Sequence, residues 1–232
     1  VPSNAGTGAN QFATLSAISC SGTTCEAGGE YEDSGAATRG LLMRLAGGAW
    51  SATEAPEPAN RGTGSNQNAL VEGMSCTFDG VCTGSGYYRD TSGNDRALIE
   101  TVTNGVPAAL EAPQPADARP ASNAVLGQVS CLSGAYCVAV GEYTNGAGNT
   151  VALIDQLSGS AWSALAAPLP GNAATTGSSV RSQLFDVSCS ARGACGVFGD
   201  YFDTGANKQG VFLSYTPPEG YWTDAGDGGV FT

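Results

Sequence analysis

Ser130–Asn145 reads SCLSGAYCVAVGEYTN, and this stretch decides the fold because it recurs along the 232-residue chain. Each recurrence has a cysteine preceded by serine, then a second cysteine, a glycine four residues later and a tyrosine two residues after that. The cysteine pairs are Cys20/Cys25, Cys76/Cys82, Cys131/Cys137 and Cys189/Cys195, and the tyrosines are Tyr31, Tyr88, Tyr143 and Tyr201. The first cysteines are 55–58 residues apart, and a period of this length indicates stacked copies of one unit.

Each unit is expected to hold four short β-strands. Alternating apolar residues and Gly/Asn/Ser turns separate the strands, and no window has a sustained helical period. In the third copy the predicted strands are Leu126–Cys131, Cys137–Tyr143, Thr150–Leu157 and Ala161–Leu165. Repeated turns follow each tyrosine, at Asp33, Asp90, Asn145 and Asp203, and a tryptophan or proline follows the third strand, at Trp50, Pro107, Trp162 and Trp222.

The hairpin turns predict one disulfide in each unit. Gly22-Thr23 suits a two-residue turn, and Gly80 suits a three-residue loop with a bulge. These registers place the two cysteines of a unit opposite each other, within reach of a disulfide. The predicted pairs are Cys20–Cys25, Cys76–Cys82, Cys131–Cys137 and Cys189–Cys195; free thiols or a metal cluster are the rival interpretation. Disulfides predict an oxidising compartment, and hence a secreted or cell-surface protein.

The expected fold class is all-β: a β-propeller of four four-stranded antiparallel blades, each with one intra-blade disulfide. One such unit cannot bury both of its faces, and kelch blades have a similar length of about 50 residues. We expect a single domain over residues 1–232, with blades at about 12–58, 69–115, 124–170 and 182–225. The ring closes either within one chain or by association of two chains.

The unit, written S-C-x(4,5)-C-x-[AG]-x-G-x-Y…W, resembles repeats of bacterial secreted β-propeller proteins over about residues 12–225, with Val197 departing from the pattern. The resemblance implies the fold and leaves the function open, because that architecture hosts lectins, enzymes and scaffolds.

Several large side chains are expected in the core. The four repeated tyrosines share a face with small residues, and Phe12, Leu15 and Ile18 fit an inner strand. Trp50, Trp162 and Trp222 are expected between blades, with ligand-stacking platforms as the alternative.

Composition excludes several functions. The net charge of −12, from 21 acidic and 9 basic residues, disfavours nucleic acid, and no apolar run is long enough for membrane insertion. Without histidine, the chain has no Ser-His-Asp or Cys-His machinery, and no motif indicates a cofactor or a metal. We therefore expect no enzyme, although paired carboxylates such as Glu26/Glu30 leave glycoside cleavage as an alternative.

The candidate binding residues lie around each repeated tyrosine, in a G-[acid]-Y-x-[D/N] pattern in which Tyr87 replaces the acid of the second copy. They are Glu30, Asp33, Asp90, Glu142, Asn145, Asp200 and Asp203. They either form equivalent sugar-binding pockets on one rim or cap the turns and face solvent. The corresponding functions are a lectin-like or adhesive module for a glycan or cell-surface polymer, and a structural module that assembles with sister chains or a larger complex.

Overall fold

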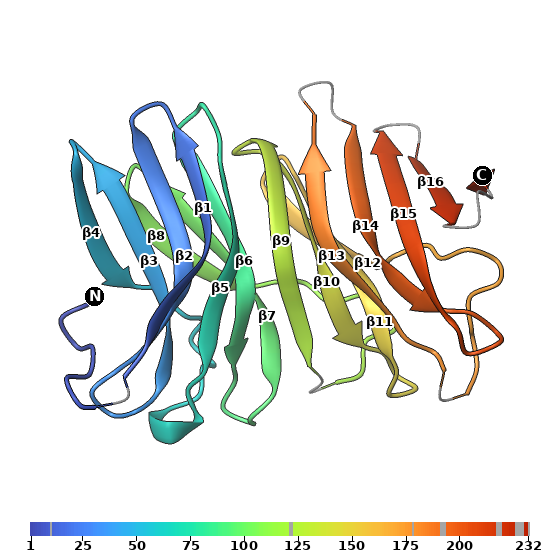
Figure 1. Cartoon of the computed structure of the whole chain (residues 1–232), viewed down its shortest axis with the longest axis horizontal. Coiled ribbons are helices and arrows are strands. Elements are labelled where there is room, and N and C mark those ends of the chain that lie inside the picture. Colours follow the sequence, from blue (N-terminus) through green and yellow to red (C-terminus); the bar gives the residue numbers. More distant parts are fainter. Residues whose placement is uncertain are drawn as a thin grey trace. The chain divides into compact units, whose positions relative to one another are not determined.

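The computed structural model describes residues 1–9, 11–120, 123–177, 179–190, 194–216, 220–225 and 230–231 (Figure 1). These residues form four antiparallel sheets in which strands that are consecutive in sequence are neighbours. Within this part of the chain, no helix has the length and apolar character that crossing a membrane requires.

The strands of each sheet follow one another along the chain. The first sheet contains β1 (Ala13–Ser21), β2 (Thr24–Glu32), β3 (Thr38–Ala46) and β4 (Ala49–Glu54). The second contains β5 (Ala69–Cys76), β6 (Val81–Arg89), β7 (Asp95–Thr103) and β8 (Val106–Glu111), preceded by the 3-10 turn Gly64–Asn66. The third contains β9 (Ala124–Ser133), β10 (Tyr136–Thr144), β11 (Thr150–Ser158) and β12 (Ala161–Ala166). The fourth contains β13 (Ser182–Cys189), β14 (Cys195–Phe202), β15 (Lys208–Thr216), β16 (Gly220–Ala225) and a short edge strand, β17 (Val230–Phe231).

Contacts divide the chain into two compact parts, each with two sheets. From here on, the first unit is Val1–Ala112, with the first and second sheets, and the second unit is Pro113–Thr232, with the third and fourth sheets; a single repeat is called a copy. The all-β class and the four repeated sheets are confirmed. The predicted strands of the third copy are found within two residues of their expected ends.

Each sheet has one disulfide between its first two strands, as the hairpin registers predicted. The bonded pairs are Cys20–Cys25, Cys76–Cys82, Cys131–Cys137 and Cys189–Cys195, each with a Cα–Cα distance of 4.0 Å. Ser21 faces Thr24 around the two-residue turn, and Thr77 binds Val81 across the three-residue loop.

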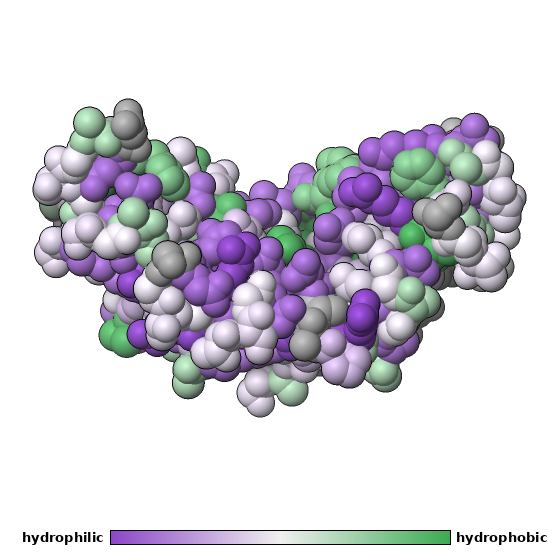
Figure 2. Space-filling model, turned by 90° about the horizontal axis from the view of Figure 1, so that it is seen from below, coloured by the Kyte–Doolittle hydropathy of each residue, from purple (hydrophilic) through white to green (hydrophobic). Residues whose placement is uncertain are grey.

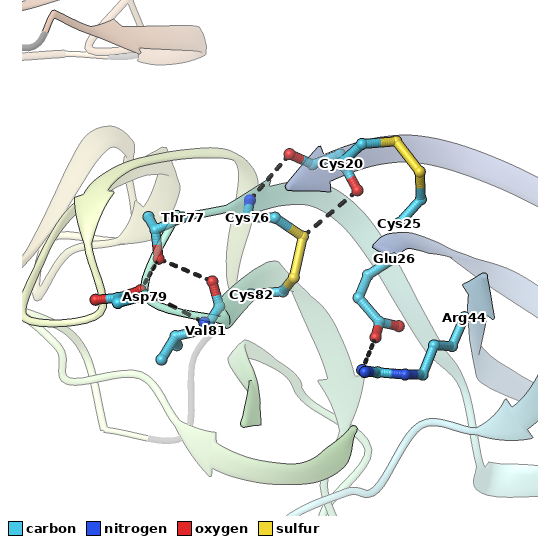
Figure 3. The surroundings of a disulfide bond; sticks show 10 residues. Cys20, Cys25, Glu26, Arg44, Cys76, Thr77, Asp79, Val81 and Cys82 are labelled. Carbon is cyan, nitrogen blue, oxygen red and sulfur yellow. Dashed lines mark hydrogen bonds and ion pairs between the residues drawn. A yellow bond between two sulfur atoms is a disulfide. The ribbon is translucent and has the colours of Figure 1, made fainter. Parts of the chain in front are cut away.

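The serine before the first cysteine joins one sheet to the next. In the first unit the Cys76 N–H donates to Ser19 Oγ at 2.9 Å, beside the two disulfides shown in Figure 3. In the second unit the Cys189 N–H donates to Ser130 Oγ at 3.0 Å. The repeated Ser-Cys pair therefore contributes a disulfide within its own sheet and a hydrogen bond to a neighbouring one.

The repeated glycine of the second strand is required by close approach of the first strand. Its partner strand has an irregular register at this point in every sheet. A Cβ added at the glycine would lie 1.9–2.0 Å from a carbonyl oxygen of that strand, too close for any side chain. The four positions are Gly29, Gly86, Gly141 and Gly199.

Within each unit the two sheets pack face to face in the same way. We call the side of a sheet that carries the repeated tyrosine its tyrosine face. In the first unit, Leu42 on the opposite face of the first sheet packs with Val71 and Met74 on the tyrosine face of the second. In the second unit, Ile154 packs in the same way with the tyrosine face that holds Leu184. The core therefore lies between sheets.

The tyrosines are core residues, as expected, and Tyr31, Tyr88, Tyr143 and Tyr201 are all fully buried. The expectation for the first sheet was wrong: Leu15, Ile18 and Trp50 are 54%, 61% and 47% exposed, and Phe12 is also exposed. Leu15, Ile18 and Trp50 lie on the tyrosine face of the first sheet, which no other sheet of its unit covers. Trp162 is half-buried, and the side chain of Trp222 lies outside the described residues. Figure 2 shows one face of the molecule, where hydrophilic residues predominate and hydrophobic residues are interspersed.

We predict that Gly141→Ala destabilises the fold by about 3 kcal/mol, because the new methyl group must displace the carbonyl of Val125. Urea unfolding measures the change. Gly210→Ala is the matched control: it is also in a strand, but no atom of the described residues lies within 4 Å of its added Cβ. Equal losses in the two variants would contradict the close-approach explanation.

Candidate functional site

The turn after the second strand is held by one carboxylate or amide side chain in every sheet. Its Oδ1 accepts two backbone N–H groups, at 2.8–3.1 Å, from residues two and four positions later. These residues are Asp33, Asp90, Asn145 and Asp203. This is the turn-capping role that the sequence allowed as one of two interpretations.

The second oxygen of each of the three aspartates is also engaged, and Asp90 Oδ2 accepts from Asn94 Nδ2 at 3.3 Å. Asp33 Oδ2 accepts from Arg39 Nε at 2.8 Å, and Asp203 Oδ2 accepts from Gln209 Nε2 at 2.9 Å. Although burial opposes it, the N–H donors and Arg39 hold the pKa of Asp33 below its ordinary value. The backbone N–H of Asn207 and the amide of Gln209 lower the pKa of Asp203. These carboxylates therefore stay charged and have little capacity left for a ligand.

The hydroxyl group of each repeated tyrosine binds the connection that precedes its sheet. The acceptors are Asn4, Asn60, Asp117 and Asn172, at 2.7–2.8 Å. In each case the next residue along the chain forms a bridge with the turn residue described above. Sequence reasoning missed this set, although an Asn or Asp 26–29 residues before each tyrosine is a signal that an alignment of the four copies reveals.

In the first unit, a glutamate and an arginine extend each tyrosine contact. Glu54 accepts from Asn4 Nδ2 at 2.7 Å and from Arg39 Nη1 at 3.1 Å. In the second sheet Glu111 accepts from Asn60 Nδ2 at 2.9 Å and from Arg96. Burial and the nearby charge of Glu54 raise the pKa of Tyr31 to about 12. These clusters fix the connection to the sheet, and alanine takes the place of the glutamate in the second unit, at Ala166 and Ala225.

The acids that directly precede the tyrosines have a different environment, because alternation places them on the opposite face. Glu30 and Glu142 are half-buried, and Asp200 is 6% exposed. Burial raises the pKa of Glu30, although the Thr14 side chain stabilises its charged form. The charge of Glu30 also raises the pKa of Tyr87, after the larger effect of burial. The first unit therefore brings Glu30 and Tyr87, at the same position of adjacent copies, near each other.

In the second unit, two of these acids are within electrostatic range of each other. Burial raises the pKa of Glu142; the charge of Arg181 opposes this shift and that of Asp200 adds to it. Asp200 Oδ2 pairs with Lys208 Nζ at 2.7 Å and lies 3.4 Å from Gln183 Nε2. Its buried Oδ1 accepts no hydrogen bond from the described residues. We define the acidic cluster as Glu142 and Asp200 with Arg181, Gln183 and Lys208; it contains both carboxylate acceptors and cationic or amide donors.

A different pair of carboxyl groups is buried in the first unit. Glu100 stands in the middle of β7, fully buried on the tyrosine face, and its oxygens accept no hydrogen bond from the described residues. Burial and the charge of Glu57 raise the pKa of Glu100 to about 9, and burial raises the pKa of Glu57 to about 7. Sequence reasoning also missed this pair; the signal is an acid inside the apolar run Ala97–Ile99 and Thr101–Val102.

In the Glu26/Glu30 pair, which the sequence left open for glycoside cleavage, Glu26 is held in an ion pair. Glu26 is 1% exposed and forms an ion pair with Arg44 at 2.5 Å (Figure 3). Across the described ranges, no group of three or more His, Cys, Asp or Glu side chains is placed to hold a metal ion.

Comparison with known proteins gives a distant likeness. The sequence matches no protein-family model and no curated protein. The structure is similar to that of AofleA from Arthrobotrys oligospora, with 11% sequence identity and a TM-score of 0.36 over 95% of this chain and 70% of that one. A triple arginine-to-alanine mutant of AofleA gives 12% identity and a TM-score of 0.38 over the same shares. We therefore infer function from the residues of this chain.

We predict that the fold loses stability as the pH rises, because of Glu100 and Glu57. Their pKa values in the folded protein, about 9 and about 7, exceed the ordinary value of 4.5, so the folded protein holds more protons than the unfolded chain above that pH. The contribution of these groups to stability is therefore highest below pH 4.5 and falls as the pH rises through 7 toward 9. Glu100→Met, which introduces the residue found at this register as Met43, should raise stability at pH 8 by about 2 kcal/mol or more.

Urea unfolding of both proteins at pH 5 and pH 8 measures this effect. At pH 5 the Glu100 carboxyl is protonated in the folded protein, so the two proteins should differ much less. An equal difference at both pH values would show that packing, and not ionisation, is responsible.

Proposed function

We propose that this chain is a carbohydrate-binding module, lectin-like in its use of several equivalent sites and without catalytic activity. The observation that carries the proposal is the acidic position before each buried tyrosine. It recurs at one register point as Glu30, Glu142 and Asp200, and Asp200 keeps an oxygen without a hydrogen bond among the described residues, whereas Oδ1 of each adjacent turn residue accepts two N–H groups.

The chemistry of the acidic cluster suits sugar hydroxyl groups. A hydroxyl group donates to a carboxylate and accepts from a cation, and both kinds of partner are present around Asp200. Arg181 and Lys208 also keep the two adjacent carboxylates from repelling each other strongly. A neutral glycan fits this mixed environment better than an anionic polymer, because the chain has a net charge of −12.

The sites would differ in strength from copy to copy. The first copy has Glu30 beside Tyr87, so a carboxylate lies near a phenol; the second unit has two carboxylates with cations. Asp33, Asp90, Asn145 and Asp203 contribute by fixing the turns beside these positions. Repetition allows weak sites to hold a polyvalent surface, since a second contact of a tethered ligand is intramolecular. Four disulfides indicate an oxidising compartment, and we propose a secreted or cell-surface location.

A glycan array tests the proposal. The 232-residue chain should bind a subset of neutral glycans, and Glu142→Gln with Asp200→Asn should weaken that binding at least tenfold, because both charged acceptors of the acidic cluster are removed. The control is Asp186→Asn, an exposed acid of β13 outside the cluster, which should leave binding unchanged.

The stability of each variant must be measured together with its glycan binding. The double variant should keep its melting temperature within a few degrees, whereas Asn145→Ala should lower stability by about 1 kcal/mol because two turn N–H groups lose their acceptor. An array without any bound glycan, or binding that the double variant retains in full, would contradict the proposal.

A further inference from the structure

Within each of the two units, the two sheets meet at equivalent positions of the repeat. The face opposite the tyrosines in one sheet covers the tyrosine face of the next sheet. In the first unit a Cβ on Gly28 would lie 2.5 Å from Val71 Cγ1, so the two sheets are in direct contact there. In the second unit Val140, at the position equivalent to Gly28, packs into the core cluster that holds Leu184, the equivalent of Val71.

The tyrosine face of the first sheet has the composition of a covered face but is uncovered. Leu15 and Ile18 occupy the positions of Val71 and Met74 in the second sheet, which are 0% and 7% exposed. The corresponding residues of the other two sheets are buried as well: Leu126, Val129, Leu184 and Val187. Only in the first sheet, among these described positions, does the pair stand in solvent.

The uncovered face has a groove along it. Leu15 and Ile18 line one side and Met43 and Trp50 the other, with the small, buried Ala27 between them. We call these five residues the Trp50 face. Its walls are apolar, and it contains no charged side chain.

In the fourth sheet it is the other face, opposite the tyrosine, that is apolar and uncovered. Its face opposite the tyrosines exposes three phenylalanine rings, Phe185, Phe198 and Phe212, at 42%, 50% and 49%. Phe212 occupies the position of Leu42 and Ile154, which are 3% and 0% exposed because a following sheet covers them. Phe185 and Phe198 lie together, with ring centroids 6.3 Å apart. We call these three residues the phenylalanine face.

We infer that the Trp50 face of one chain binds the phenylalanine face of a second copy of the same chain. The two faces are of the kinds that cover each other within both units, and both are solvent-exposed in the single chain. The rings would fill the groove over Ala27, at the register where Val71 and Leu42 meet within the first unit. The occupant is a second copy because the groove matches the opposite face of the repeat itself, and the fourth sheet presents three exposed phenylalanine rings on such a face.

The contact is heterologous, since each copy contributes a different face. Two copies that use both of their faces form a closed pair, and copies that cannot close the contact form a chain. Several exposed aromatic side chains buried at one contact are typical of a stable interface. This inference does not rest on the proposed glycan sites, although Asp200 and Lys208 lie on the same side of the fourth sheet as the phenylalanine face and Lys208 Nζ is 6.0 Å from the centroid of the Phe185 ring.

Sedimentation of the 232-residue chain over a range of concentrations tests the inference. The chain should associate, and both Trp50→Glu and Phe212→Glu should reduce self-association at least tenfold by placing a charge in the contact. Phe78→Glu is the matched control: Phe78 is fully exposed in a hairpin loop outside both faces, so self-association should not change.

Mixing the two variants gives the sharper result. A Trp50→Glu chain keeps an intact phenylalanine face, and a Phe212→Glu chain keeps an intact Trp50 face, so an equimolar mixture should form a one-to-one complex although neither variant associates alone. All three altered side chains are at least 47% exposed, so the melting temperatures should stay close to that of the unaltered chain. A chain that remains monomeric at every concentration, or a mixture that remains monomeric, would overturn the inference.

Discussion

A four-stranded sheet with apolar residues on both faces is stable only when another sheet covers each face. This constraint explains why the sequence is repetitive: each copy supplies one face to its neighbour and receives another. In the first unit, Leu42 reaches Val71 and Met74, and in the second unit Ile154 reaches the cluster of Leu184 and Val187. The Ser19–Cys76 and Ser130–Cys189 hydrogen bonds join the same pairs of sheets at the end that holds the disulfides. The repeated Ser-Cys motif is thus part of the sheet-to-sheet contact as well as of the hairpin.

Within each sheet, the glycine before the tyrosine sets the geometry of the first strand. Because Gly86 has no Cβ, the carbonyl of Leu70 passes directly over it and the register of β5 shifts by one residue. The shift keeps Val71 and Met74 on one face although three positions separate them. A strict two-residue alternation would have sent one of these side chains to the opposite face. The glycine therefore determines which side chains reach the neighbouring sheet.

The repeat made most of the architecture predictable. Strands, hairpin registers and disulfide partners follow from local alternation and turn chemistry, which one copy shows and the other three repeat. Exposure of Trp50 was not predictable in this way, because a periodic pattern describes what each copy needs and not which copies have a neighbour. Glu100 was missed because the copies differ at its register: the third also has a buried acid, Asp155, but the first and fourth have the apolar residues Met43 and Leu213.

At the candidate site, the sequence pattern grouped residues that the structure separates by role. Asp203 and Asp200 are three positions apart in one motif, yet Asp203 accepts two turn N–H groups, whereas Asp200 lies on the sheet and keeps an oxygen without a hydrogen bond among the described residues. Spacing alone cannot distinguish them, because a carboxylate that caps a turn and one that faces a ligand use the same atoms.

The Trp50 face and the phenylalanine face need side chains that match between sheets, and the acidic cluster does not. Within the two units, the position that packs against the next sheet is small or aliphatic, at Gly28 and Val140, whereas the equivalent residue of the fourth sheet is Phe198. A phenylalanine at that register would not fit the contact within the first unit, where even a Cβ at Gly28 would meet Val71. The fourth sheet is therefore built for a wider gap than the first, and the groove beside Ala27 on the Trp50 face provides one. Binding a ligand at the acidic cluster requires no such match between sheets, since its carboxylates already have their cations within one unit.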